Sequence, residues 1–118
     1  MIQIRKTYNE VNPELLYAEI RDFTLKQGVS LGENKLETYT LPDESATFIS
    51  RSTLTFRVKD GSGKAEKVCL RVHIVGSARG ETKLMIDVNE ALFPQEKVSA
   101  LQDDLDFIFS SYEAEVTL

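Results

Sequence analysis

The chain has 118 residues, of which 42% are hydrophobic and 28% charged, and it carries a net charge of −5. This length and composition predict one globular α+β domain, residues 1–118, with a single core. The acidic balance disfavours a general nucleic-acid binder, and no apolar run approaches the roughly 20 residues that a membrane-spanning helix needs.

A strand and then a helix are predicted near the start of the chain. Apolar and polar residues alternate from Ile2, as in a short strand with one buried face. A helix follows over residues 12–27, because Asn12 can cap free backbone N–H groups and Pro13 suits the first helical turn. Gly28 is placed to end this helix in the left-handed conformation.

Four strands are predicted next. The first covers residues 29–41, where Gly32 and Asn34 indicate a bulge or a bend. The other three form an antiparallel meander in which the apolar residues fall at even positions and share one face. These three strands cover residues 46–59, 65–76 and 82–89.

A last helix is predicted from Pro94, which suits the first helical position, over about 20 residues. Its apolar stripe comprises Val98, Leu101, Leu105, Ile108, Phe109 and Tyr112. The whole order, β-α-β-β-β-β-α, predicts a single curved antiparallel five-stranded sheet with both helices on one face.

This order of elements resembles the helix-grip topology of START-like ligand-binding proteins and of the TATA-binding-protein-like fold. The resemblance covers nearly the whole chain and rests on topology, not on a motif. It implies that the sheet grips the C-terminal helix, here Phe93 to Tyr112, and it suggests a small apolar ligand held between the two.

No catalytic, metal or nucleotide motif is found, so we expect no enzyme, no metal and no cofactor. Gly61-Ser62-Gly63-Lys64 lies between two strands and lacks the spacing of a P-loop. Cys69 and His73 lie four residues apart on one strand, about 13 Å, which is too far for a catalytic pair. We expect both on the outer sheet face. The aspartates of the last helix lack the spacing of a calcium loop.

Charge is segregated along the chain and points to a candidate surface. Residues 46–83 carry a net charge of +5, and residues 84–118 carry −7. Six meander residues at odd positions are expected on the outer face as a partner-binding surface: Arg51, Arg57, Lys67, Arg71, His73 and Lys83.

The expected register places like charges together on that face. A five-residue loop at 60–64 would pair Arg57 with Lys67 and Arg51 with His73. Such neighbours need counter-charge, from Asp87, from the acidic helices of another subunit or from an acidic partner. An ordinary solvated face is the alternative.

Ser50 and Ser52 interrupt the apolar face of their strand. A bulge that turns them outward, close packing against a helix, and a small ligand pocket are the three explanations. The pocket would be lined by Tyr39, Phe48, Ser50, Ser52, Leu54, Phe109 and Tyr112.

These features favour a small non-enzymatic binding or adaptor protein that pairs with itself or with an acidic protein. The alternative is a helix-grip carrier of a small apolar ligand, and an enzyme of that fold comes third. Cys69 is the single cysteine, which suits a reducing compartment. Because residues 1–11 lack a signal-peptide pattern, we expect the cytoplasm.

Overall fold

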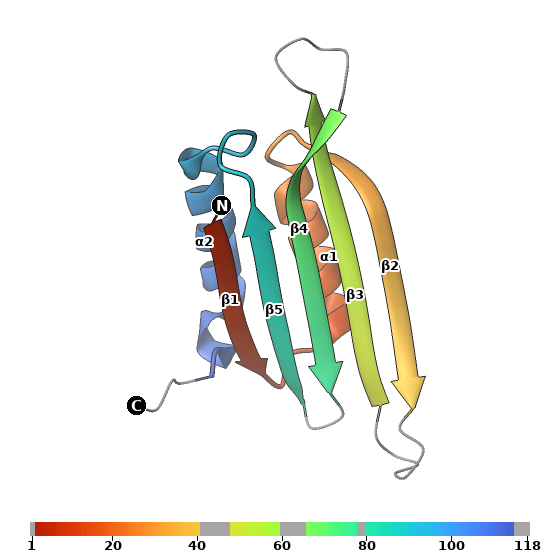
Figure 1. The fold of residues 1–118 in the computed structure, drawn as a ribbon. Coiled ribbons are helices and arrows are strands. Elements are labelled where there is room, and N and C mark those ends of the chain that lie inside the picture. Colours follow the sequence, from red (N-terminus) through yellow and green to blue (C-terminus); the bar gives the residue numbers. More distant parts are fainter. Residues whose placement is uncertain (1, 41–47, 60–65, 78–79, 115–118) are drawn as a thin grey trace.

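A computed structural model describes residues 2–40, 48–59, 66–77 and 80–114 of the chain. Its elements are β1 (Ile2–Asn9), α1 (Pro13–Leu25), β2 (Ser30–Thr40), β3 (Phe48–Lys59), β4 (Glu66–Ser77), β5 (Glu81–Val88), α2 (Gln95–Phe109) and a 3₁₀ turn (Ser110–Tyr112). The strands form one antiparallel sheet in the order β1-β5-β4-β3-β2 (Figure 1). The predicted α+β class and element order are confirmed.

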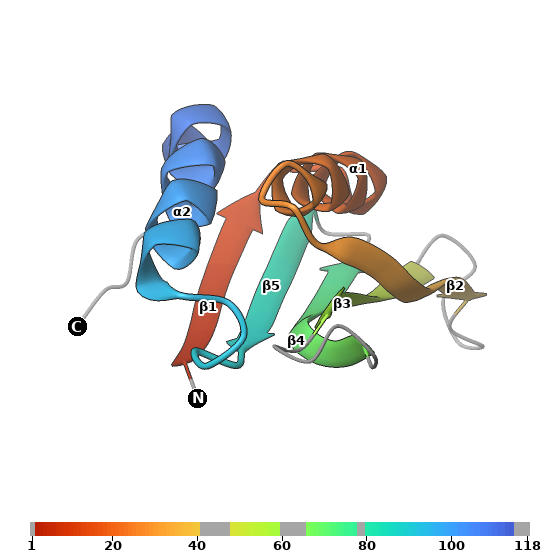
Figure 2. The same ribbon diagram turned by 90° about the horizontal axis from the view of Figure 1, so that it is seen from above.

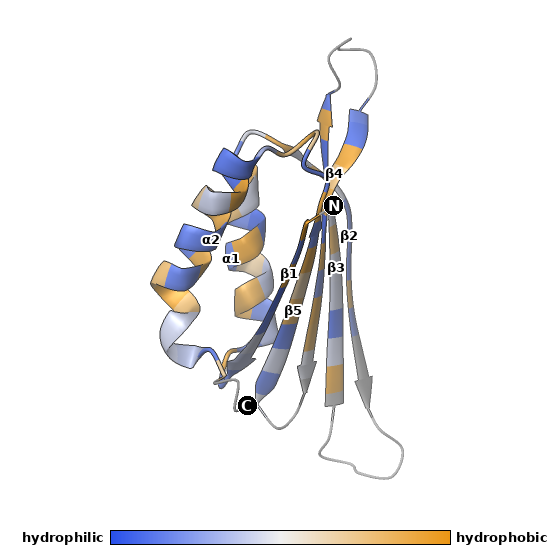
Figure 3. Ribbon diagram, turned by 60° about the vertical axis from the view of Figure 1, so that its left-hand side comes forward, coloured by the Kyte–Doolittle hydropathy of each residue, from blue (hydrophilic) through white to orange (hydrophobic). Residues whose placement is uncertain are grey.

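Both helices lie on one face of the sheet, and the other face is not covered by either helix. Figure 2 shows α2 beside β1 at one edge, and α1 farther across the sheet. Figure 3 shows both helices on the same side of the sheet, with apolar and polar residues alternating along each helix. An ion pair between Lys26 Nζ and Asp104 Oδ2, 3.2 Å apart, joins the end of α1 to α2.

The boundaries of α1 follow the predicted signals. The side chain of Asn12 accepts a hydrogen bond of 2.8 Å from the backbone N–H of Glu14. Gly28 has a φ of +88°, which a residue with a side chain rarely adopts. Leu16 and Ile20, one turn apart, are fully buried against the sheet.

Helix α2 buries most of its predicted stripe. Val98, Leu101, Leu105 and Phe109 are buried. Ile108 and Tyr112 are partly exposed, at 39% and 46%. The ring of Phe109 packs on the ring of Tyr8 from β1, with centroids 5.6 Å apart, so α2 is anchored over the β1 edge of the sheet. None of the helices in the described residues is long and apolar enough to cross a membrane.

Strand β2 contains the predicted irregularity. Its register against β3 shifts between Leu31 and Asn34, so a bulge lies at Gly32. A Cβ at Gly32 would lie 3.0 Å from the backbone oxygen of Thr55. The glycine therefore allows the bulged strand to approach β3 closely.

The predicted register of the β3–β4 hairpin is wrong. Lys59 pairs with Glu66, and Phe56 pairs with Leu70 where Val68 was expected. A shift between Phe56 and Arg57 inserts one extra residue into β4. The even number of residues between Lys59 and Glu66 would by itself turn the apolar face of β4 outward, and the bulge restores the alternation beyond it.

Because of the bulge, two residues do not lie on the outer face, where they were predicted. Lys67 pairs with Val58, an inward position of β3, and so leaves the outer face where it was expected. Cys69 lies at the bulge and is 1% exposed within the apolar core, not on the outer face. Cys69 and His73 were both predicted on the outer face, and of the two only His73 lies in register with an outer-face residue, Thr53.

Candidate functional site

The uncovered sheet face is organised in three rows of paired residues. The strand registers place neighbours from β1, β5, β4 and β3 side by side. The rows are Gln3, Asp87, Arg71 and Thr55; Arg5, Met85, His73 and Thr53; and Thr7, Lys83, Val75 and Arg51. Strand β2 extends two of these rows with Lys35 and Glu37.

The expected like-charge pairs do not form. Arg51 lies between Val75 and Glu37, where His73 was predicted beside it. Arg71 lies beside Asp87, one of the expected sources of counter-charge. The change of register places Val75 beside Arg51 and Val68 beside Arg57, in place of His73 and Lys67. Independently of it, strands β2 and β5 give Arg51 and Arg71 a carboxylate as a cross-strand neighbour.

Arg57 lies apart from the other predicted cations. It pairs with Val68 on β4 and with Ser30 on β2, beside the bulge at Gly32. Its Nε is buried and has no hydrogen-bond partner among the described residues. Arg57 therefore belongs to the packing of the β2 edge.

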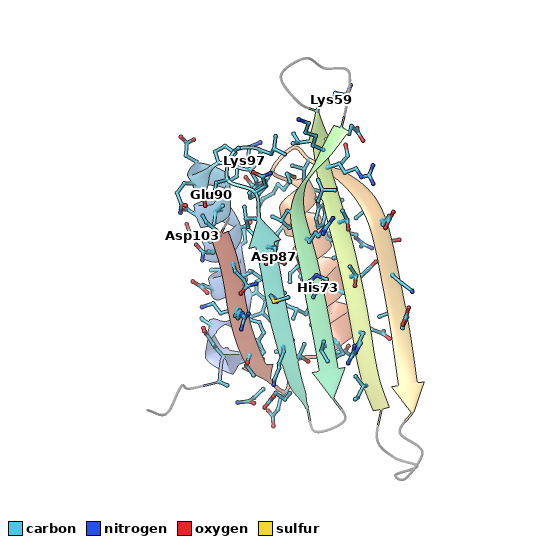
Figure 4. The ribbon with its side chains drawn as sticks, viewed as in Figure 1. Lys59, His73, Asp87, Glu90, Lys97 and Asp103 are labelled. Carbon is cyan, nitrogen blue, oxygen red and sulfur yellow. The ribbon has the colours of Figure 1, made fainter. Side chains whose placement is uncertain are left out.

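A hollow of about 440 Å³ opens on the uncovered face between β1, β5 and β4. Its apolar floor includes Val75 and Met85, and its cationic or imidazole groups come from Arg5, His73 and Lys83. The full lining is Arg5, Lys6, Thr7, His73, Val75, Lys83, Leu84 and Met85, which includes no carboxylate. We call this site the basic hollow. Figure 4 labels His73 on β4 within this face.

The cations of the basic hollow differ in how they are held. Arg5 Nε donates to Gln3 Oε1 at 2.7 Å, and Gln3 Nε2 donates to Asp87 Oδ1 at 2.8 Å. These two hydrogen bonds, from Arg5 to Gln3 and from Gln3 to Asp87, orient Arg5 although no carboxylate contacts it directly. Lys83 lies 3.8 Å from Glu81, and both side chains are well exposed, so this pair contributes little.

The edge of β1 continues the basic hollow into a second one of about 370 Å³. Arg5, Lys6, Thr7 and Lys83 line both. Lys6 is neutralised there by Glu113, with Nζ and Oε1 2.9 Å apart. The backbone N–H of Ala114 donates to the oxygen of Thr7 at 2.8 Å, so the chain itself occupies part of the β1 edge.

Sequence reasoning found two members of the basic hollow, His73 and Lys83, and missed Arg5. The alternation of β1 places Arg5 opposite to the buried Ile4. Its position beside the meander depends on β1 pairing with β5, across more than 70 residues of chain. No pattern of neighbouring residues in the sequence predicts that β1 pairs with β5.

The residues of the predicted ligand pocket lie in two separate groups. Phe109 packs on Tyr8 of β1, and Tyr112 directly follows α2 at that edge. Ser50, Ser52 and Leu54 lie on β3. Three strand intervals separate β1 from β3, which is ~14 Å.

The remaining two pocket residues have different register positions. Phe48 is in phase with Ser50 and Ser52 along β3, whereas Tyr39 pairs with Ile49 and is out of phase with them. The side chains of Tyr39 and Phe48 lie outside the described part of the structure. The other five residues do not line one common space between the sheet and α2.

Close packing accounts best for the two serines. Ser50 and Ser52 stay in regular register with Gly76 and Ile74, so no bulge turns them outward, and both are buried. A Cβ at Gly76 would lie 2.5 Å from Cγ of Pro13. Small residues here let the start of α1 rest on the sheet. Ser52 Oγ has no hydrogen-bond partner among the described residues.

Cys69 is held inside the fold. Its Sγ donates to the backbone oxygen of Phe56 at 3.5 Å, and burial raises the pKa of the thiol, which keeps it protonated. Among the described residues, no group of three or more His, Cys, Asp or Glu side chains could hold a metal ion.

Comparison with known proteins adds no relative. No protein-family model matches this chain, and a search of curated proteins finds no match.

Proposed function

We propose that this chain is a small, non-enzymatic binding protein that docks an acidic segment of a partner protein in the basic hollow. The observation that carries the proposal is the composition of that hollow. Arg5, His73 and Lys83 surround an apolar floor, and none of the described residues that line it carries a carboxylate. A ligand with both negative charge and an apolar side chain would complement it.

The arrangement favours an extended or helical protein segment over a small anion. Arg5, Lys83 and the imidazole of His73 come from three different strands and flank Val75 and Met85. A free anion would gain only exposed charge contacts, which are weak in water. A peptide could add apolar burial, which supplies most of the affinity in such interfaces.

The test is fluorescence anisotropy with a short labelled peptide rich in Asp and Glu around one Phe. We expect Arg5→Glu together with Lys83→Glu to weaken binding by about tenfold or more at low salt. The same peptide with Lys in place of its acidic residues should not bind.

Lys59→Glu is the matched control, because it makes the same change of charge elsewhere on the protein. Lys59 is exposed at the far end of β3, six residues along the strand from Thr53 beside His73, or ~20 Å. Equal loss of affinity in Lys59→Glu and in the hollow variants would refute a defined site.

A helix-grip carrier of a small apolar ligand is the second candidate. The hydroxyl of Ser52 supports it, because it is buried and has no hydrogen-bond partner within the described part of the chain, as does the topology that the chain resembles. Native mass spectrometry of the purified protein should then show a bound small molecule that Ser52→Leu displaces, while Ser52→Ala retains it. A spectrum of the bare chain in all three proteins would eliminate this candidate.

We place the protein in the cytoplasm as part of the proposal. A single cysteine suits a reducing compartment. Fractionation of cells that express a tagged full chain tests this placement, and recovery in a secreted fraction would contradict it.

A further inference from the structure

The outer surface of α2 carries a large apolar side chain that is not buried in the core. Phe107 is 90% exposed, and the exposed Asp103 lies one turn before it on the same side of the helix. Asp106, also exposed, directly precedes it. An aromatic ring flanked by carboxylates is the combination that the basic hollow would accept.

The charges of the two surfaces are complementary. Residues 84–118, which include α2, carry a net charge of −7, and residues 46–83, which include β4 and Lys83 of β5, carry a net charge of +5. The aspartates around Phe107 would meet Arg5, His73 and Lys83, while the ring would meet Val75 and Met85.

We propose that the occupant of the basic hollow is α2 of a second copy of this chain, with Phe107 inserted between Val75 and Met85. This inference rests on the proposed function, because it assigns the acidic partner segment to the chain itself. Aromatic anchors that fill a pocket ringed by polar residues dominate the affinity of many interfaces.

The positions of the two surfaces determine the kind of assembly. Figure 2 shows α2 over one face of the sheet near β1. The basic hollow is lined by residues of β1, β5 and β4 and opens on the other face. Figure 4 labels Asp103 on α2 and His73 on β4. Two rigid copies cannot insert both helices reciprocally, so each copy gives one contact and receives another. Such a contact is heterologous and builds open chains.

Two complementary variants of the full chain test the proposal by sedimentation velocity. The hollow variant carries Arg5→Glu and Lys83→Glu and keeps α2 intact. The helix variant carries Asp103→Lys and Phe107→Ser and keeps the basic hollow intact. Each variant therefore keeps one of the two proposed contact surfaces and loses the other. The matched controls are Lys59→Glu and, for an exposed apolar residue on the other helix, Leu15→Ser, since Leu15 is 51% exposed.

We expect wild type and both controls to grow in mean mass with concentration and to dissociate as salt is raised. Each variant alone should stay monomeric at concentrations about tenfold above those at which wild type associates. Their equimolar mixture should form pairs and nothing larger, because one contact remains possible.

Three outcomes would overturn the inference: a monomeric wild type up to about 1 mM, chains that form equally in both variants, or a closed dimer. The labelled acidic peptide separates this failure from failure of the proposed function. Peptide bound in the hollow of a monomeric wild type leaves the proposed function standing without self-association. If the variant mixture forms pairs but the peptide does not bind, self-association stands and the proposed binding of an acidic segment of another protein fails.

Discussion

At the scale of single residues, small side chains decide how closely the layers meet. Gly76 and Ser50 are paired on β4 and β3, and Pro13 rests on the glycine. The contact connects the first turn of α1 to the middle of the sheet. A pattern of alternating apolar residues predicts which face is inward, but it does not report which positions must be small.

Gly76→Ala is predicted to destabilise the protein by ~1–3 kcal/mol, as overpacking of a core does. The added Cβ would lie 2.5 Å from Cγ of Pro13, and the rigid ring cannot turn away, so α1 must shift. Urea unfolding measures the loss. Pro13→Ala in the same background should recover part of it. A Gly76→Ala protein as stable as wild type would contradict this account.

Tyr8 is the buried ionisable residue with the clearest consequence for pH. It is 1% exposed, and its hydroxyl has no hydrogen-bond partner among the described residues. Burial raises its pKa above the ordinary value of 10.0, and the charges of Glu113 and Asp106 raise it further. The folded state therefore holds this proton at a pH where the unfolded chain releases it.

The stability linked to Tyr8 is complete below the unfolded pKa of 10.0 and is lost as pH rises above it, by about 1.4 kcal/mol per pH unit. Tyr8→Phe should remove this part of the alkaline decline and be no less stable than wild type at pH 7, since a buried unpaired hydroxyl is costly. Urea unfolding from neutral to alkaline pH measures both. Tyr112→Phe, at an exposed tyrosine, should leave the decline unchanged.

At the scale of elements, the hairpin of β3 and β4 shows how one bulge changes an interpretation. The even spacing from Lys59 to Glu66 and the extra residue near Cys69 compensate each other. Arg51 therefore lies beside Val75 and not beside His73, while β2 and β5 place Glu37 beside Arg51 and Asp87 beside Arg71. A prediction from alternation alone assumes that the two strands pair without a bulge. The even spacing and the bulge together therefore make every predicted pair between β3 and β4 wrong.

The apolar residues of helix α2 are of two kinds: some are buried against the sheet, and others are exposed on the outer side of the helix. Leu101 is completely buried, and Phe107 is 90% exposed. Leu101→Ala should cost ~2–5 kcal/mol of unfolding free energy. Phe107→Ala should change it by less than about 0.5 kcal/mol. Thermal unfolding of dilute protein distinguishes the two. A large loss in Phe107→Ala would show that this ring supports the fold.

At the scale of the whole molecule, two layers leave one side of a five-stranded sheet uncovered. Both helices lie on one side of the sheet (Figures 1 and 2), and the basic hollow opens on the other side. An uncovered face with segregated charge is suited to recognition, since steering and specificity depend on such complementarity.

Stability should be uneven across this sheet. β4 and β5 are central, whereas β1 and β2 are at the edges. We expect amide hydrogen exchange to be slowest in β4 and β5 and fastest in the bulged β2, because edge strands open with less loss of packing. Equal protection of β2 and β4 would indicate one cooperative unit and contradict this prediction.

The element order, the two helix starts, the bulge in β2 and most of the core are predictable from the sequence, because caps, glycines and hydrophobic periodicity are local signals. Tertiary structure alone decided the β3–β4 register, the burial of Cys69, the separation of Ser50 and Ser52 from Phe109, and the entry of Arg5 into the basic hollow. Each of these depends on pairing or packing between distant segments, which no local pattern records.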